Sequence, residues 1–234
     1  MTRVLDVYFR DTKAGVLGRL DDGLLIFAYD GAYLLDQRSR AISFSMPLQE
    51  EPFGDQVVRP FFSGLLPDEG ARQRLAGALG LSAGNAFGLL EVIGGECAGA
   101  LSIYPTGTAP EPPGQSQAEI LTSERLDEVL SRLRTRPLLG GDEGIRLSLA
   151  GAQDKLAVIV DGDSIALARD GRPTTHILKP VIQALEGTVE NEYFCMQLAA
   201  RLKLPVPHVQ IRLDGATAFL LVERYDRTKA ADGI

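Results

Sequence analysis

The chain has 234 residues, with 24 lysine and arginine residues against 31 aspartate and glutamate residues and a formal net charge of -7. This acidic surplus argues against a large nucleic-acid surface, because such a surface must neutralise phosphates, but it does not exclude that the chain reaches nucleic acid through a basic partner. Hydrophobic residues make up 45% of the sequence and charged residues 24%, a globular composition at a length that can fold without a disulfide or metal.

No targeting or membrane segment is predicted. The N-terminal stretch MTRVLDVYF lacks a signal-peptide pattern, and no apolar run reaches the ~18 residues that a membrane span needs, so we expect a cytoplasmic protein without membrane contact. Cys97 and Cys195 lack CxxC and Cys/His metal spacing, and we expect both to be buried, reduced thiols. The two histidines, His176 and His208, have no nucleophile or metal-ligand spacing nearby and are expected to be structural.

The first 105 residues mix strand and helix patterns and predict an α+β unit. Apolar alternation, with a hairpin signal at Asp21-Asp22-Gly23, predicts strands over 4–9, 15–20, 24–29, 41–46 and 98–104. Helical periodicity predicts helices over 60–66 and 69–79. A third helix is expected to begin after a capping Asn85 and to end at Gly94-Gly95.

Residues 106–118 have the composition of a linker, rich in proline, glycine, serine and glutamine. We therefore place a domain boundary there, which leaves 1–105 and 119–234 as two domains. In the second, Ser123 is expected to cap a helix whose apolar face consists of Leu126, Val129, Leu130 and Leu133.

Strands dominate the rest of the second domain. We predict strands over 145–147, 156–160, 164–168 and 176–179, with Asp-Gly turns at 161–163 and 170–171. A helix over 189–202 follows, and then a hairpin of 209–212 with 218–222. This order predicts an antiparallel sheet accompanied by one helix.

The stretch SLAGAQDK (148–155) lies between two predicted strands, 145–147 and 156–160. A small, polar-edged turn can point backbone N–H groups at one place, as a phosphate chain requires. The stretch is neither a Walker-A loop nor a GxGxxG loop. With a single glycine, Gly151, it is by spacing alone better explained as an ordinary hairpin turn.

Lys179 closes the apolar strand HILK, where a lysine is costly to desolvate without a partner. It is either a lysine that extends to solvent or a phosphate ligand. Glu190 and Glu192, in the first turn of the next helix, either serve the helix dipole or pair with Lys179. A strand lysine followed by an acidic helix is the spacing of a protein-kinase N-lobe.

Four blocks, in this order and at compatible spacing, resemble the HipA family of bacterial toxin kinases: SLAGAQDK (148–155), PTTHILKP (173–180), ENEYFCMQLA (190–199) and VERYDR (222–227). The first half is similar to that family's leading domain in SFSMPLQ (43–49), FFSGLLPD (61–68) and FGLLEVIGGECAGAL (87–101). The resemblance covers essentially the whole chain.

The resemblance implies an α+β fold: a HipA-like N-terminal subdomain followed by a protein-kinase-like N-lobe of antiparallel sheet plus helix, with the C-lobe absent. It implies an ATP- and Mg2+-dependent serine/threonine-protein kinase toxin of a toxin–antitoxin system, paired with a DNA-binding, HipB-like antitoxin. Well-known members phosphorylate an aminoacyl-tRNA synthetase, which blocks translation and produces dormancy and persistence.

The resemblance also implies which residues contact the phosphates of ATP, because they match the family's phosphate-binding positions. Lys179 matches the family's strand lysine, and Ala152, Gln153 and Lys155 lie in the block that matches its phosphate-covering loop.

On the other side of the implied site, Glu223 and Tyr225 match the adenine-side connector. Ser148 matches the loop serine that family members autophosphorylate, which would make this chain a phosphoprotein. A phosphate there adds about −1.5 to −2 charges to a loop meant to wrap phosphates, and should eject that loop and silence the enzyme.

The family's H-x-K-N catalytic loop and metal-binding aspartate match no stretch of this sequence, since His176 precedes ILK and His208 precedes VQI. No catalytic or metal-binding residue is assigned, and we expect these residues alone not to phosphorylate: a missing base costs ~10²–10⁴ in rate. The ending AADGI indicates a chain that stops mid-fold. We expect an exposed apolar face, and with it either self-association or partial mobility near 179–187 and after Arg227.

Two other classes of function stay open. One is a non-catalytic interaction module that binds an antitoxin or a separately encoded kinase lobe. The other is a nucleotide-binding domain of unrelated chemistry.

Overall fold

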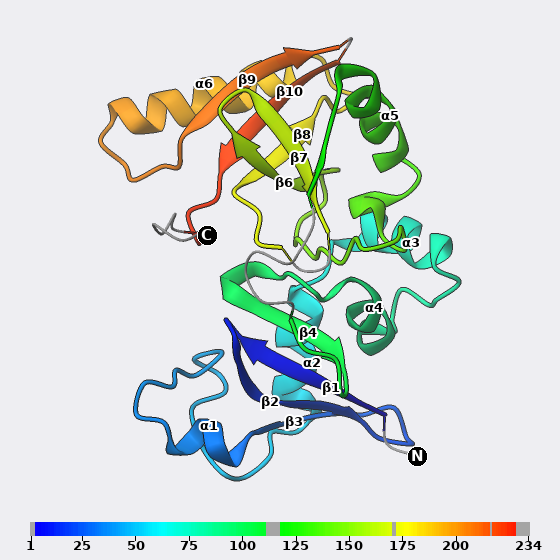
Figure 1. The fold of residues 1–234 in the computed structure, drawn as a ribbon, viewed down its shortest axis with the longest axis vertical. Helices are drawn as coiled ribbons and strands as arrows, with labels where there is room; N and C mark the ends of the chain where they lie inside the picture. The colour runs from blue at the N-terminus through cyan, green and yellow to red at the C-terminus, as the bar shows by residue number, and fades with distance from the viewer. Residues whose placement is uncertain (1–2, 111–117, 170–171, 216, 228–234) are drawn as a thin grey trace.

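Two antiparallel sheets, each accompanied by helices, make up the architecture (Figure 1). The computed structural model describes residues 3–110, 118–169, 172–215 and 217–227. The expected turn at 170–171, most of the expected linker and the ending AADGI lie outside the described residues. The mixed α+β class expected from the sequence is confirmed.

The first sheet has the strand order β3-β2-β1-β4. Its strands are β1 (Arg3–Phe9), β2 (Thr12–Arg19), β3 (Leu25–Tyr29) and β4 (Leu101–Pro105). Gly15 of β2 lies against the neighbouring strand so closely that a Cβ there would be 2.2 Å from the carbonyl oxygen of Ala28. The helices of this half are α1 (Gly31–Leu35), α2 (Asp55–Gly64), α3 (Glu69–Ala78) and α4 (Ala86–Ile93).

Two expectations for this half were wrong. No strand forms over 41–46, where Ser43 and Met46 share only an isolated bridge. Helix α2 begins five residues before Pro60, which lies inside it. A tertiary contact that periodicity does not report holds its first turn: Asp55 accepts a hydrogen bond from the Leu25 amide at 2.7 Å, in addition to its i,i+4 pair with Arg59.

The second sheet has the strand order β5-β7-β6-β8-β10-β9. Its strands are β5 (Ala118–Ile120), β6 (Leu156–Asp161), β7 (Ser164–Ala168), β8 (His176–Pro180), β9 (Val209–Asp214) and β10 (Thr217–Glu223). Helix α6 (Thr188–Arg201) packs against β9 and β10, and α5 (Ser123–Leu133) lies beside the turn between these two strands, where Asp127 is next to Gly215 (Figure 1). The expected strand over 145–147 is absent, because Leu147 pairs in an isolated parallel bridge with Glu96.

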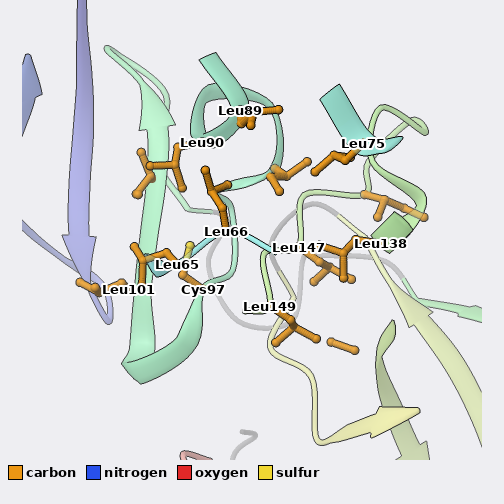
Figure 2. Packing of buried hydrophobic residues seen from close by; sticks show 14 of the residues in the cluster. Leu65, Leu66, Leu75, Leu89, Leu90, Cys97, Leu101, Leu138, Leu147 and Leu149 are labelled. Atoms are coloured by element: carbon orange, nitrogen blue, oxygen red, sulfur yellow. The ribbon is translucent and has the colours of Figure 1, made fainter. Parts of the chain in front are cut away.

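Buried side chains of both sheets belong to one hydrophobic cluster, which runs from Leu5 and Leu17 in the first sheet to Leu178 and Leu221 in the second. Between the sheets the cluster is filled largely by leucines, among them those labelled in Figure 2: Leu65, Leu66, Leu75, Leu89, Leu90, Leu101, Leu138, Leu147 and Leu149. The two halves therefore share their core.

Exposed apolar residues gather on α6 and β9. Phe194, Leu198 and Leu202 on or just after the helix are 63%, 46% and 67% exposed. Cys97 is buried as expected, but Cys195 is exposed, because α6 turns that side away from the sheet. Self-association through the apolar residues stays a prediction. None of the described helices combines the length and apolarity needed to cross a membrane.

The expected helix cap at Ser123 was also wrong: the side chain of Thr122 accepts the hydrogen bond from the Arg125 amide, at 3.3 Å. We predict that Thr122→Ala lowers the free energy of unfolding by about 1 kcal/mol, because an N-terminal amide loses its acceptor. Ser123→Ala, the matched control, should change it by less than about 0.5 kcal/mol. Denaturant unfolding measures both, and equal losses in the two variants would contradict the assignment.

Candidate functional site

The loop 148–155 is anchored to the first half of the chain. The Ser148 amide donates to the Glu96 carbonyl at 2.8 Å, and the carbonyl of Gly151 accepts from the Asp68 amide at 3.3 Å. Strand β6, which follows the loop, pairs with β7 and β8 and not with the residues before the loop. The hairpin interpretation is therefore wrong.

Two lysines meet beside this loop. The antiparallel register of β6 and β8, with Leu156 opposite Leu178, places Lys155 opposite Lys179. Burial lowers the pKa of Lys155, and the charge of Lys179 lowers it further. Its Nζ donates to the Ala150 carbonyl at 2.6 Å. Over the described ranges Lys155 forms no ion pair within 4 Å, although the charges of Asp68, Glu192 and Asp154 act to raise its pKa.

Lys179 does have an ionic partner. Its Nζ lies 2.5 Å from Oε1 of Glu192 on α6, and both side chains are partly buried. The structure thus selects Glu192 from the two expected glutamates, while Glu190 is exposed. A lysine held by a carboxylate from a neighbouring helix keeps a fixed direction, which suits a ligand for a charged group.

The remaining expected positions divide between the two ends of this region. Gln153 donates from Nε2 to the Pro180 carbonyl at 3.3 Å, next to Lys179, and Ala152 is exposed on the loop. Glu223 and Tyr225 are exposed at the end of β10. Strand pairing sets Leu220 opposite Lys179, so Glu223 lies three residues, or roughly 10 Å, farther along the strand.

Ser148 is fully buried, and its Oγ donates to the Leu65 carbonyl at 2.6 Å. In this conformation the hydroxyl has a partner and no contact with solvent. Modification of Ser148 therefore requires the loop to leave its place against residues 65–68.

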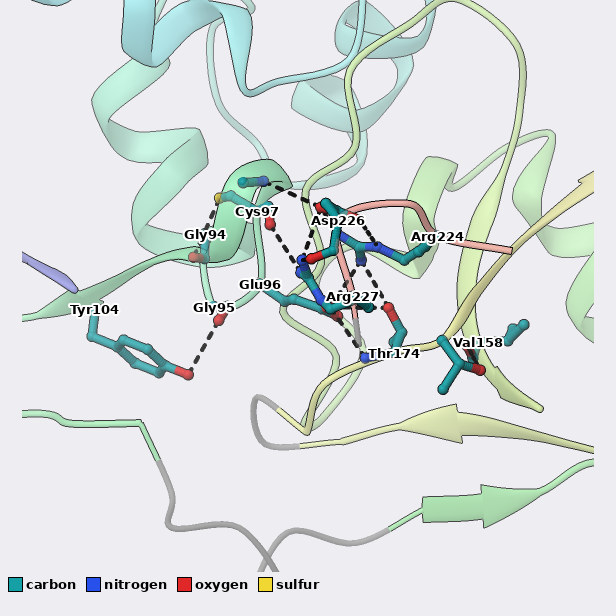
Figure 3. Close-up of polar contacts among 12 residues, drawn as sticks. Gly94, Gly95, Glu96, Cys97, Tyr104, Val158, Thr174, Arg224, Asp226 and Arg227 are labelled. Atoms are coloured by element: carbon teal, nitrogen blue, oxygen red, sulfur yellow. Dashed lines mark hydrogen bonds and ion pairs between the residues drawn. The ribbon is translucent and has the colours of Figure 1, made fainter. Parts of the chain in front are cut away.

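A buried charged cluster, which sequence reasoning missed, joins the first half to the end of β10 (Figure 3). Oε1 of Glu96 accepts from Nη1 of Arg224 at 2.8 Å and from Nη2 of Arg227 at 3.0 Å. It also accepts from the amide and hydroxyl of Thr174, at 3.1 and 2.9 Å. Asp226 closes the cluster through Arg224, at 2.8 Å, and through Arg227.

The cluster pairs two carboxylates with two guanidinium groups, so its formal charge is zero. Burial by itself would raise the pKa of Asp226, but hydrogen bonds from Arg224 and the charges of Arg224 and Arg227 hold it at about 2. A sequence signal existed: Glu96 lies in the apolar run IGGECAGAL, where a carboxylate is costly without a partner. Its partner, 128 residues away, could not be read from spacing.

Comparison with known proteins identifies relatives of both halves. The family described as HipA N-terminal domain matches residues 5–104, and the family described as HipA-like C-terminal domain matches residues 147–232. A Sinorhizobium fredii protein named as a candidate kinase, Y4mE, is 44% identical over 99% of this chain. The serine/threonine-protein kinase toxin HipA of Shewanella oneidensis is 32% identical over 97% of it.

The chain spans about half the length of these curated relatives, 56% of the first and 51% of the second. A solved structure agrees: the Shewanella oneidensis complex of HipA, HipB and operator DNA contains a chain with a TM-score of 0.78 and 28% identity. That match covers 98% of this chain and 52% of the other. The fold is therefore that of about half of a HipA chain.

We predict that the contribution of Asp226 to stability is present above pH ~4 and lost as the pH falls towards 2, because its folded-state pKa lies below the value of an unfolded aspartate. Partial exposure of the side chain reduces that contribution to about 1–2 kcal/mol. Asp226→Asn should unfold more easily at pH 7, and the difference from the parent should close between pH 4 and 2.

Denaturant unfolding at several pH values measures this difference. Asp161→Asn, at an exposed aspartate that ends β6, is the matched control and should show no such pH-dependent gap. A gap for Asp226→Asn that stays constant from pH 7 to 2 would contradict the assignment.

Proposed function

Because the chain belongs to the HipA family, we propose that it forms the nucleotide-binding part of a serine/threonine-protein kinase toxin of a toxin–antitoxin system. The observation that carries this proposal is the pair formed by Lys155 and Lys179 beside the loop 148–155. Lys155 forms no ion pair among the described residues, and the ion pair with Glu192 holds the side chain of Lys179 in one direction.

Two ammonium groups brought this close repel one another, and an anion that contacts both relieves the repulsion. A triphosphate has the charge and the length to reach both lysines and the loop. We assign the phosphates of ATP to Lys155, Lys179 and the loop at Ala152 and Gln153. The adenine side is assigned to Glu223 and Tyr225, where the exposed tyrosine ring offers a flat apolar face.

Magnesium and phosphoryl transfer are not assigned to these residues. Within the described ranges, no group of three His, Cys, Asp or Glu side chains could hold a metal. Mg2+, which would neutralise phosphate charge when bound, is therefore proposed for the part of the relatives' length that this chain does not match, together with the catalytic base.

Partners and regulation extend the proposal. The solved relative is titled as a complex with HipB and operator DNA, and we propose a HipB-like antitoxin as the partner, with DNA contacted only through it. The substrate would be a translation-related protein such as an aminoacyl-tRNA synthetase, and the site of action the cytoplasm. Phosphorylation of Ser148 would stabilise the loop outside its buried position, because a doubly charged group cannot stay unpaired in that core.

The division of the chain into 1–105, a linker over 106–118 and 119–234 is kept as part of the proposal. It is supported by the two sheets, which use residues on either side of the linker.

We predict that ATP with Mg2+ raises the melting temperature of the chain and that Lys179→Ala abolishes the shift. At 100 times its dissociation constant, a ligand adds about 2.7 kcal/mol to the free energy of unfolding. Lys203→Ala, which removes an exposed lysine just after α6, is the matched control and should keep the parent's shift. Equal shifts in the parent and Lys179→Ala would refute the assignment of the phosphate site.

We also predict that these 234 residues alone transfer no phosphate from ATP, because no catalytic base or metal ligand is assigned among them. Incorporation of labelled phosphate into the chain itself or into an added protein measures this. A rate comparable to that of an intact HipA kinase would show that the chain holds the missing groups.

A further inference from the structure

Glu96 belongs to none of the parts assigned to nucleotide binding, yet it contacts three of them. Its backbone carbonyl accepts from the Ser148 amide at the start of the loop. Its carboxylate accepts from Thr174, just before β8, and from Arg224 and Arg227 in the connector after β10. These three segments lead to the loop, to Lys179 and to Tyr225.

We propose that Glu96 is a positioning residue that holds the loop, strand β8 and the connector in register, so that one nucleotide can engage all three. The inference rests on the proposed function, because the register matters only if a single ligand spans these segments. It gives the first half of the chain a direct part in nucleotide recognition.

The backbone of Glu96 fixes where the loop begins. Its amide donates to the Arg146 carbonyl at 2.8 Å, and its carbonyl accepts from the Ser148 amide at 2.8 Å, which together form the parallel bridge with Leu147. Because both bonds involve neighbouring residues of one segment, the loop leaves this point in a set direction.

The carboxylate fixes the other two segments relative to that point. One oxygen, Oε1, accepts from the amide and hydroxyl of Thr174 and from both arginines. Arg224 adds a bond from its amide to the Thr175 carbonyl at 2.9 Å, which ties the connector to the start of β8. Since Glu96 is only 6% exposed and Arg224 4%, displacing either leaves an unpaired buried charge, so one arrangement is strongly preferred.

A positioning role and a merely structural role predict different binding behaviour. A ligand that reaches both the loop and the connector gains affinity only if the two are correctly spaced. Adenosine needs only the connector, and inorganic triphosphate needs only the end of the loop at Lys155 and Lys179, which the pairing of β6 with β8 holds together without Glu96. Loss of register therefore weakens ATP binding selectively. General loss of folded protein weakens the binding of all three ligands by the same factor.

The test compares the parent chain, Glu96→Gln and the matched control Glu91→Gln, which breaks the pair with Arg3 and removes none of the hydrogen bonds of Glu96. Calorimetry measures the dissociation constants of ATP, adenosine and inorganic triphosphate. For Glu96→Gln we expect the constant for ATP to rise at least ~10-fold, since misplacement by about 1 Å can cost more than that. The constants for both fragments should stay within about twofold of the parent's, and Glu91→Gln should match the parent throughout.

Hydrogen exchange on the chain without ligand supplies a second measurement that does not depend on fragment affinity. Glu96→Gln should speed exchange at the amides of Ser148, Thr174 and Arg224 together, and leave the amides of β2 unchanged. Acceleration confined to the neighbourhood of residue 96 would overturn the proposal.

Two binding outcomes would also overturn it: unchanged affinity for ATP in Glu96→Gln, or equal losses for ATP and both fragments. If the parent itself does not bind ATP, the proposed function fails and this inference fails with it. Parent binding that Lys179→Ala removes but Glu96→Gln leaves intact would refute the inference alone.

Discussion

The buried pairing of Glu96 with Arg224 is the interaction on which the rest of the arrangement depends. It joins the first half of the chain to the end of β10 across 128 residues of sequence, within a cluster of two carboxylates and two guanidinium groups. A charge in such surroundings is tolerated only when it is paired and hydrogen-bonded, so the cluster accepts few alternative geometries. The cluster therefore fixes the position of the two sheets relative to one another.

The position of the loop 148–155 depends on how the two halves are held together. A loop that followed its own hairpin would be placed by β6 alone. This loop instead donates hydrogen bonds to the carbonyls of Glu96 and Leu65 and accepts one from the Asp68 amide, all in the first half. The conformation of the loop therefore depends on contacts with both halves of the chain. The buried Ser148 hydroxyl lies where the two halves meet. A charge added at Ser148 would act on that contact as well as on the loop.

The second sheet contributes a different constraint, namely strand register. Pairing of β6 with β8 brings Lys155 opposite Lys179, and packing of α6 on the same sheet supplies Glu192. Lys179 is thereby held in one direction, and Lys155 has no ion pair among the described residues. This arrangement is suited to bind an anion. The likeness to the HipA family supports the proposal that this anion is a phosphate chain.

Sequence alone determined the elements whose signals are local. The alternation of β1 to β3, the Asn85 cap, the apolar face of α5 and the helix over 188–201 follow from periodicity and capping chemistry. The motif residues could also be named from the sequence, because their order and spacing along the chain can be read without coordinates. Only the tertiary structure decided the choice of Glu192 over Glu190, the start of α2 at Asp55, the pairing of Leu147 with Glu96 and the cluster around Arg224. Each of these depends on a partner in another segment, from 13 residues away for Glu192 to 128 for Arg224, whose position is set by packing and not by spacing.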